Sequence, residues 1–134
     1  MKQDNRTEKR KLGDIGENIA CEYLAKHGFE IIDRNYQRKW GEIDIVARKA
    51  DMYRFIEVKS VRVPHETISN VPRATDLYRP EDNVHPWKIK RLHRAIQTYM
   101  LEKRLDADWQ LDLITVKIEE TKHLARVELI ENII

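Results

Sequence analysis

The hydrophobic positions of the chain follow two different periods, which divide it into helical and extended segments. Apolar residues recur every three or four positions over residues 11–27 and 86–104, as is typical of amphipathic helices. Short apolar runs rich in β-branched residues predict strands at residues 29–34, 43–47, 55–61, 109–118 and 124–130. The predicted order is therefore helix, three strands, helix, two strands.

This order predicts an α/β domain in which helices cover the faces of a central sheet. The first three strands can form a meander, and the second helix can return the fourth strand parallel to a neighbour, giving a mixed sheet. A chain of 134 residues is long enough for one domain with one core. Because neither a linker nor a repeat divides the sequence, we expect a single domain over residues 1–134.

Residues 63–84 interrupt the regular pattern. The segment is polar, and all four prolines of the chain lie in it or just after it. Loops longer than about 12–15 residues are uncommon and are usually functional or disordered. We expect a mobile loop here, for which a lid ordered by substrate and a floppy surface insertion are the two interpretations; the second requires fewer assumptions.

The composition excludes several classes of protein. Charged residues make up 36% of the chain and hydrophobic residues 41%, which suits a globular domain rather than a disordered one. No apolar run reaches the roughly 20 residues needed to cross a membrane, and the N-terminal residues lack the apolar core of a secretory signal. The lone cysteine, Cys21, excludes an internal disulfide framework and a cysteine-based zinc site. We therefore expect a cytoplasmic protein.

The net charge is only +2, but basic residues are gathered locally. They lie near the N-terminus, in a polar connection around Trp40, after the third strand and on the second helix. The candidate nucleic-acid-binding positions are Arg38, Lys39, Arg62, Lys88, Arg91 and Arg94. Basic residues can hold phosphates, and aromatic residues among them can stack on bases. From charge alone, solvated surfaces are the simpler interpretation.

Several charged residues lie inside apolar strands. The second strand contains Asp44, and the third contains Glu57 and Lys59. Because side chains alternate faces along a strand, Glu57 and Lys59 are expected to point the same way. Buried charges are costly unless they are compensated, and carboxylate oxygens are the ligands that Mg²⁺ prefers. These residues therefore form a candidate metal site.

The same alternation predicts how the second strand is oriented. Glu42 and Asp44 should share one face, and the apolar residues 43, 45 and 47 should take the other. Asp112 is a further acid within an apolar strand, and a neighbouring Arg or Lys is its simpler explanation. On the first helix, Glu17 lies at the flank of the apolar stripe. It could either reach a packed sheet or form a capping box with Asp14 in the first helical turn.

Taken together, these residues resemble a known family. The similarity rests on the ordered motifs Gly13-x-x-Gly16-Glu17, Gly41-Glu42-Ile43-Asp44 and Glu57-Val58-Lys59. The pattern is similar to the YraN-type bacterial proteins, a family assigned to the restriction endonuclease-like, or PD-(D/E)xK, superfamily. The resemblance runs from the first helix through Asp112, and archaeal Holliday-junction resolvases share the layout. Each motif alone is weak, whereas their order and spacing together are much more specific.

The resemblance implies a restriction endonuclease-like core and a metal-dependent endonuclease, a hydrolase that cuts phosphodiester bonds of DNA, including branched or structured DNA. Asp44 and Glu57 would hold Mg²⁺ or Mn²⁺, and Glu17 would reach the same site from the first helix. Lys59 would be the active-site lysine. The sequence departs from the family in one place, because the arginine expected two positions after the lysine is replaced by a valine. Arg62 follows one position later and should start on the opposite strand face.

Two other interpretations remain open at this stage. The first is a non-catalytic nucleic-acid-binding domain on the same scaffold. The second is a structural protein whose acids and lysine form internal ion pairs. The superfamily also includes dimers, and the apolar residues Ile133 and Ile134 could pack on a second copy, so a homodimer is a further expectation.

Overall fold

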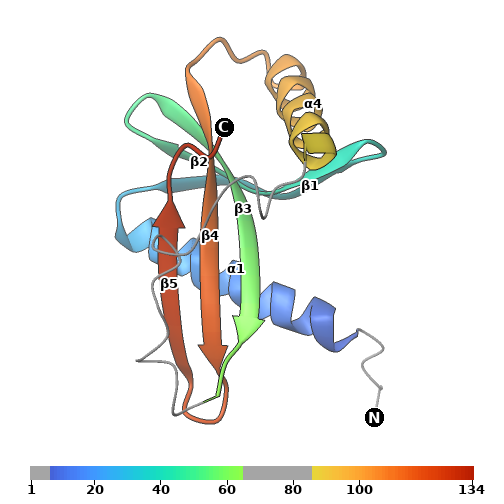
Figure 1. Cartoon of the computed structure of the whole chain (residues 1–134). Coiled ribbons are helices and arrows are strands. Elements are labelled where there is room, and N and C mark those ends of the chain that lie inside the picture. The colour runs from blue at the N-terminus through green and yellow to red at the C-terminus, as the bar shows by residue number, and fades with distance from the viewer. Residues whose placement is uncertain (1–6, 65–85) are drawn as a thin grey trace, which may run out of the picture.

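The computed structural model of the chain describes residues 7–64 and 86–134. The described elements, in chain order, are α1 (Glu8–Lys26), β1 (Glu30–Arg38), β2 (Gly41–Lys49), β3 (Met52–Arg62), α4 (Pro86–Glu102), β4 (Trp109–Glu119) and β5 (Leu124–Ile130) (Figure 1). The predicted order of helices and strands is confirmed. The loop expected at residues 63–84 lies outside the described residues, apart from Val63 and Pro64.

The five described strands form one mixed sheet in the order β1-β2-β3-β4-β5. Neighbouring strands are antiparallel except for β3 and β4, which run parallel and are joined through the segment that contains α4. The meander of the first three strands and the crossover into the fourth were both predicted. The chain therefore has the expected α/β fold, with a central sheet and two flanking helices.

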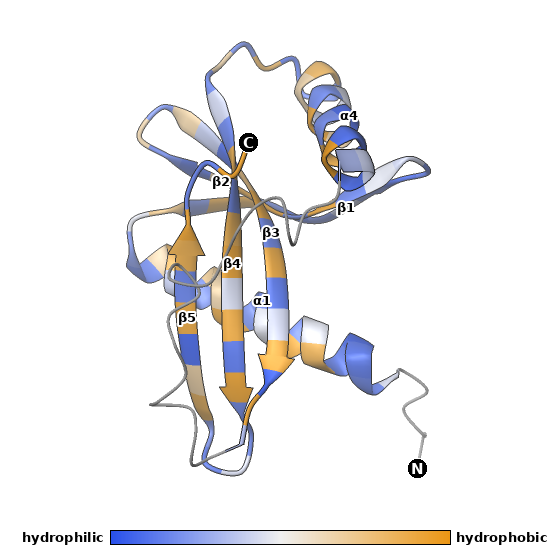
Figure 2. Cartoon of the chain, viewed as in Figure 1, coloured by the Kyte–Doolittle hydropathy of each residue, from blue (hydrophilic) through white to orange (hydrophobic). Residues whose placement is uncertain are grey.

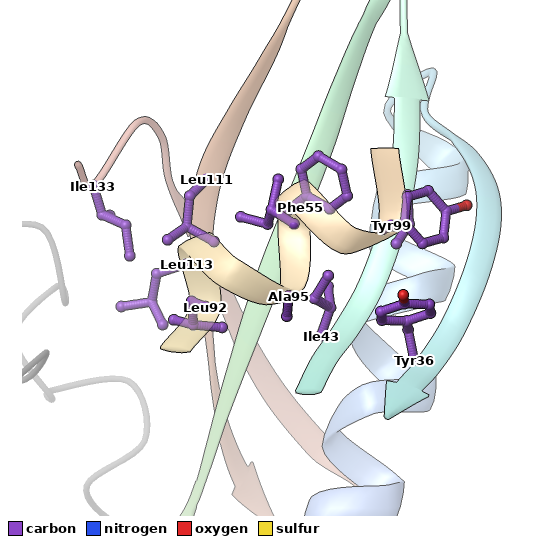
Figure 3. Packing of buried hydrophobic residues seen from close by; sticks show 11 residues of the cluster. Tyr36, Ile43, Phe55, Leu92, Ala95, Tyr99, Leu111, Leu113 and Ile133 are labelled. Atoms are coloured by element: carbon purple, nitrogen blue, oxygen red, sulfur yellow. The ribbon is translucent and has the colours of Figure 1, made fainter. Parts of the chain in front are cut away.

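The two described helices pack on opposite faces of the sheet. On the α4 face, Tyr99 and its helical neighbours cover Phe55, Leu111 and Leu113 (Figure 3). On the α1 face, Ala20 and Leu24 belong to a second cluster, which includes Ile114. Figure 2 shows hydrophobic and hydrophilic residues mixed along β4 and β5. Strand β4 contributes to both clusters, with Leu111 and Leu113 in the first and Ile114 and Val116 in the second. Neither described helix is long and apolar enough to cross a membrane.

Helix α1 begins earlier than the sequence pattern predicts. Thr7 is its N-cap residue, and the Thr7 side chain accepts a hydrogen bond from the Arg10 N–H at 3.2 Å. Asp14 and Glu17 therefore lie inside the helix, and the capping-box interpretation of this pair is wrong. Gly16 lets α1 approach β3 closely, because a Cβ atom at that position would lie 1.6 Å from the Ser60 Oγ.

Strand β1 is longer than predicted, because the chain continues as a strand through residues that read as a polar connection. Asn35 has a φ of 52°, a conformation that asparagine tolerates better than most residues. This residue breaks the alternation of faces: the side chains of Arg34 and Asn35 both bind Glu17 of α1, whereas Tyr36 is buried beneath α4. The strand then pairs with β2 as far as Arg38.

The predicted orientation of β2 is wrong at one position. Ile43 packs in the cluster beneath α4, whereas Ile45 and Ala47 pack in the cluster against α1. The change of face falls where the pairing of β2 with β3 ends, because that ladder covers only Ile45 to Lys49. At Gly41 the beginning of β2 touches α4, where a Cβ atom would come within 2.8 Å of the Arg91 carbonyl oxygen.

The C-terminal residues also differ from expectation. Ile133 is buried in the cluster beneath α4, and its backbone N–H donates to the Leu111 carbonyl oxygen at 2.9 Å. Its side chain is therefore not available to a second copy of the chain, and the prediction fails for this residue. Ile134 is 45% exposed. The homodimer itself stays a prediction.

Candidate functional site

The candidate site lies where β2 separates from β3. The last pair of the ladder joins Ile45 to Ile56, and β3 continues beyond it alongside β4. At this point the Asp44 side chain replaces a backbone acceptor, because its Oδ2 accepts a hydrogen bond from the Val58 N–H at 2.8 Å. The divergence of the two strands thus places a carboxylate at the edge of the site, and a backbone N–H fixes its position.

The environment of Asp44 disfavours its negative charge. Burial, the nearby charge of Glu57 and the weaker influence of Glu42 and Glu17 raise the pKa of Asp44 to about 7, against the opposing effect of the Val58 N–H. The predicted acids therefore lie close enough to act on one another electrostatically. Such a group is stabilised in its ionised form by a cation placed beside it.

Glu57 and Lys59 lie on the α4 side of β3. The pairing of β3 with β4 runs without a register shift from Tyr53 to Arg62, so Lys59 keeps the same face as Glu57. The Glu57 side chain is largely buried, and its Oε1 lies 2.7 Å from the Nζ of Lys88 on α4. Lys59 is exposed. The predicted shared face of the Glu-x-Lys motif is thus present.

Glu17 reaches the neighbourhood of the site from α1, but its carboxylate is engaged by β1. The Glu17 Oε1 accepts hydrogen bonds from the Arg34 Nε at 2.9 Å and the Asn35 Nδ2 at 3.0 Å, and the residue is buried. Among the described residues, no three His, Cys, Asp or Glu side chains converge closely enough to hold a metal ion. Asp44 and Glu57 are therefore the two carboxylates that could together act as metal ligands. Mg²⁺ in proteins usually has only one or two carboxylate ligands, together with water and substrate phosphate.

A cleft of about 450 Å³ opens at Glu57, between the β1–β2 hairpin and the first turns of α4. It brings together three of the predicted phosphate-binding residues with two acids. Its lining residues are Gln37, Arg38, Gly41, Glu42, Glu57, Trp87, Lys88, Arg91 and Leu92.

Two cations of the cleft are held by contacts within the chain. Arg38 binds Glu102 through Nε–Oε1 and Nη2–Oε2 contacts of 3.1 and 2.5 Å, and its guanidinium lies 4.2 Å from the centre of the Tyr36 ring. The Nε of Arg91 donates to the Trp40 carbonyl oxygen at 3.0 Å. These contacts fix the two guanidinium groups at the wall of the cleft.

The remaining predicted cations lie outside the cleft lining. Arg94 lies 4.6 Å from the centre of the Trp40 ring, and Lys39 is exposed in the turn between β1 and β2. Arg62 lies on the α1 side, where it binds Glu120 at 2.8 Å and Glu8 at 3.3 Å. As its spacing predicts, Arg62 is on the opposite face from Glu57, and the structure does not bring it to the candidate site.

Sequence reasoning did not identify Trp87 as a residue of this site. Trp87 follows the proline that opens α4, and it is 52% exposed within the cleft lining. The sequence did contain a signal for this residue, because Trp87 is an aromatic residue directly beside Lys88 and one helical turn before Arg91. The same pattern of aromatic and basic residues drew attention to Trp40 instead.

The fold and this arrangement define an α/β protein with a mixed sheet and two flanking helices, consistent with a nuclease-like core. Residues 16–116 match the model of Uncharacterised protein family UPF0102. The chain is 38% identical over 116 residues to a UPF0102 protein of Campylobacter fetus subsp. fetus (strain 82-40), covering 87% of this chain and 92% of that protein. It is 36% identical over 105 residues to a UPF0102 protein of Campylobacter jejuni (strain RM1221), covering 78% and 82% of the two chains.

The chain belongs to the UPF0102 family, that is, to the YraN family that the sequence motifs indicated. The matched region includes Glu17, Asp44, Glu57 and Lys59, together with the cations of the cleft on α4. The family is uncharacterised, so membership supplies no activity, and the chemistry has to be argued from the site.

Proposed function

We propose that this protein is a metal-dependent endonuclease that hydrolyses phosphodiester bonds of DNA, with branched or structured DNA as its substrate. The observation that carries the proposal is the placement of Asp44. Its half-buried carboxylate lies close enough to other acids for their charge to raise its pKa, although the cleft at Glu57 is lined by Arg38, Lys88 and Arg91. A cationic cleft with an acidic floor suits a phosphodiester that is bound together with a divalent cation.

The donor set fits Mg²⁺ or Mn²⁺. Asp44 and Glu57 would hold the ion, because both offer carboxylate oxygens at the point where β2 and β3 separate. When bound, a divalent ion neutralises charge on phosphoryl oxygens and makes water a better nucleophile at neutral pH. Glu17 lies close enough to influence Asp44, and its part in the reaction would be to add negative charge behind that ligand.

The chain's own cations would act on the substrate. Lys59 shares the face of Glu57, where its ammonium group would orient the attacking water and stabilise the negative charge that develops on the phosphoryl group. Lys88 would exchange its contact with Glu57 for a phosphate oxygen, and Arg91 would hold a flanking phosphate. We find no device for reading base edges among the described residues, so the shape or strand character of DNA is the expected basis of selection.

A non-catalytic nucleic-acid-binding domain is the second candidate function. Two observations favour it: Arg34 engages Glu17, and Lys88 engages Glu57. A site whose acids are neutralised by the chain's own cations could bind phosphates through the cleft without holding a catalytic metal ion. The two proposals differ in whether cleavage accompanies binding.

The test is a cleavage assay on single-stranded, duplex, flap and four-way DNA and on RNA, with Mg²⁺ or Mn²⁺. The variants are Asp44→Asn, Glu57→Gln and Lys59→Met. The matched controls are Asp51→Asn and Lys122→Met, which change exposed residues in turns. We expect each of the three site variants to lower the cleavage rate by about 100-fold or more, since each removes a charge that acts on the reacting phosphate.

The controls should cleave at the rate of the unchanged chain. Binding, measured in parallel without divalent metal, separates the two functions. Binding of DNA without cleavage of any substrate would favour the non-catalytic domain. Cleavage that survives Asp44→Asn and Lys59→Met unchanged would show that another site or a contaminant is responsible.

A further inference from the structure

Trp87 is an exposed aromatic residue at the start of α4. It lies on the first turn of α4 with 52% of its surface exposed, although α4 has an apolar face that packs on the sheet. The other two tryptophans have packing roles: Trp109 contacts Phe55 and His93 at the core, and Trp40 lies under Arg94. Among the described residues, Trp87 belongs to neither of the two core clusters.

The surroundings of Trp87 link it to the candidate site. The ring lines the same cleft as Glu57, and Lys88, the next residue, contacts Glu57 at 2.7 Å. The guanidinium of Arg91, one helical turn later, lies 5.6 Å from the centre of the ring. The Trp40 carbonyl oxygen in turn holds Arg91 in place. An aromatic ring therefore lines the cleft together with two cations, one of which contacts Glu57.

This combination is the one that proteins use to hold unpaired nucleotides. Positively charged groups follow the backbone, and an aromatic ring stacks on a base, which requires that the base have an uncovered face. In a continuous duplex, neighbouring base pairs cover both faces of each base. The cleft of about 450 Å³ is also in the size range of small-ligand sites, which suits one nucleotide rather than a double helix.

We propose that Trp87 is a stacking platform for an unpaired base of the DNA substrate, and that it selects strands with an unpaired nucleotide over continuous duplex. The inference rests on the proposed function, because it assumes that nucleic acid occupies the cleft. The phosphate of the stacked nucleotide would lie against Lys88 and Arg91. Trp87 is thus a specificity-determining residue, and it takes no part in the chemistry at Asp44.

The test measures binding without cleavage. Fluorescence anisotropy of labelled single-stranded DNA and of the matching duplex is recorded in the presence of a chelator for the unchanged chain, Trp87→Ala and Trp87→Phe. Leu101→Ala is the matched control, because Leu101 is 78% exposed at the other end of the same helix. We expect Trp87→Ala to weaken single-strand binding by about 10-fold and duplex binding by less than about twofold. Trp87→Phe should retain most of the affinity, and Leu101→Ala all of it.

Equal losses on both forms of DNA, or unchanged binding of the single strand, would overturn the inference. Tryptophan emission provides a second readout that does not depend on the folding of Trp87→Ala. Single-stranded DNA should quench the emission of the unchanged chain, and Trp87→Phe should lose that quenching; quenching that persists in Trp87→Phe would overturn the inference as well.

The test of the stacking platform and the test of the nuclease can fail independently of each other. Selective single-strand binding that depends on Trp87, without cleavage in the presence of metal, would uphold the stacking platform and overturn the nuclease. Cleavage that depends on Asp44, combined with binding that ignores Trp87, would uphold the nuclease and overturn the stacking platform.

Discussion

Two aspartates on strands of the same sheet, the half-buried Asp44 of β2 and the buried Asp112 of β4, lie in opposite electrostatic settings. Asp112 is completely buried, and it accepts hydrogen bonds from the Arg54 Nη1 at 3.1 Å, the Gln110 Nε2 at 2.7 Å and the Asn132 N–H at 2.8 Å. Asp44 accepts the Val58 N–H, and the largest charge effects on its pKa come from other acids.

The comparison shows that burial of an acid is not by itself a sign of function. Asp112 has a cation and two further donors, which is how a structural carboxylate is stabilised in a core. The sequence-based expectation of an Arg or Lys partner for it is confirmed by Arg54. Asp44 occupies a site that destabilises its charge, and a residue kept at such a cost is a candidate for chemistry.

The largest effect is expected at the compensated acid. Asp112→Ala removes the fully buried partner of Arg54, which keeps only the exposed Glu131, and leaves the N–H of Asn132 without its acceptor. We expect the free energy of unfolding to fall by about 3–5 kcal/mol, as is typical when one partner of a buried ion pair is removed. Urea unfolding measures this value. Asp51→Ala, at an exposed carboxylate, should change it by less than about 0.5 kcal/mol. If Asp112→Ala lowered the free energy of unfolding by less than about 1 kcal/mol, Asp112 would not be the stabilising structural acid that distinguishes it from Asp44.

Removing the charge of Asp44 should raise the free energy of unfolding, whereas the change at Asp112 should lower it. Folding raises the pKa of Asp44 to about 7, so the folded chain binds a proton more tightly than the unfolded chain. The contribution of Asp44 to stability is therefore greatest below its unfolded pKa and is lost as the pH rises through the folded pKa. Without divalent metal, Asp44→Asn should stabilise the fold at about pH 8 by an amount on the order of 2–4 kcal/mol.

The pH dependence provides the control for this prediction. Below about pH 4 the aspartate is protonated in both states, so the advantage of Asp44→Asn should disappear there. Unfolding measured by urea at several pH values tests the difference. An Asp44→Asn variant that is less stable than the unchanged chain at neutral pH would mean that the carboxylate is compensated after all.

A smaller effect is expected at Lys88, which partly neutralises the site. Lys88→Met removes the cation that contacts Glu57. Because 43% of the Lys88 side chain is exposed, solvent screens the ion pair, and the free energy of unfolding should change by less than about 1 kcal/mol. Divalent-ion binding should strengthen by a few-fold and DNA binding should weaken. Lys90→Met, at an exposed lysine on the same helix, is the control, and equal effects of both variants on ion binding would contradict the role given to Lys88.

Much of the fold could be predicted from local patterns. The order of the elements and the parallel pairing of β3 with β4 follow from hydrophobic periodicity and the rules of strand connection. The shared face of Glu57 and Lys59 also follows, because β3 is a regular strand along its whole length. The element order and the shared face depend on residues that are near one another in the chain, and the pairing of β3 with β4 follows from the rule for crossover connections.

The geometry of the site could not be predicted in this way. The separation of β2 from β3 is associated with the close packing of α4 on Gly41, a contact between segments about 50 residues apart. The capture of Glu17 depends on the positive φ of Asn35, which breaks the alternation of faces in β1. Trp87 joins the site only because α4 lies beside the β1–β2 hairpin.

The most direct test of the central claim is a Mn²⁺ titration of the protein, followed by electron paramagnetic resonance at about pH 6 and about pH 8. If the Asp44 carboxylate binds the ion, protons compete for it, and affinity should be about 10-fold weaker at the lower pH. Asp44→Asn should bind more weakly at both pH values and lose most of this dependence. Affinity that is the same for Asp44→Asn and for the unchanged chain, or no binding at either pH, would contradict the assignment of Asp44 as a metal ligand.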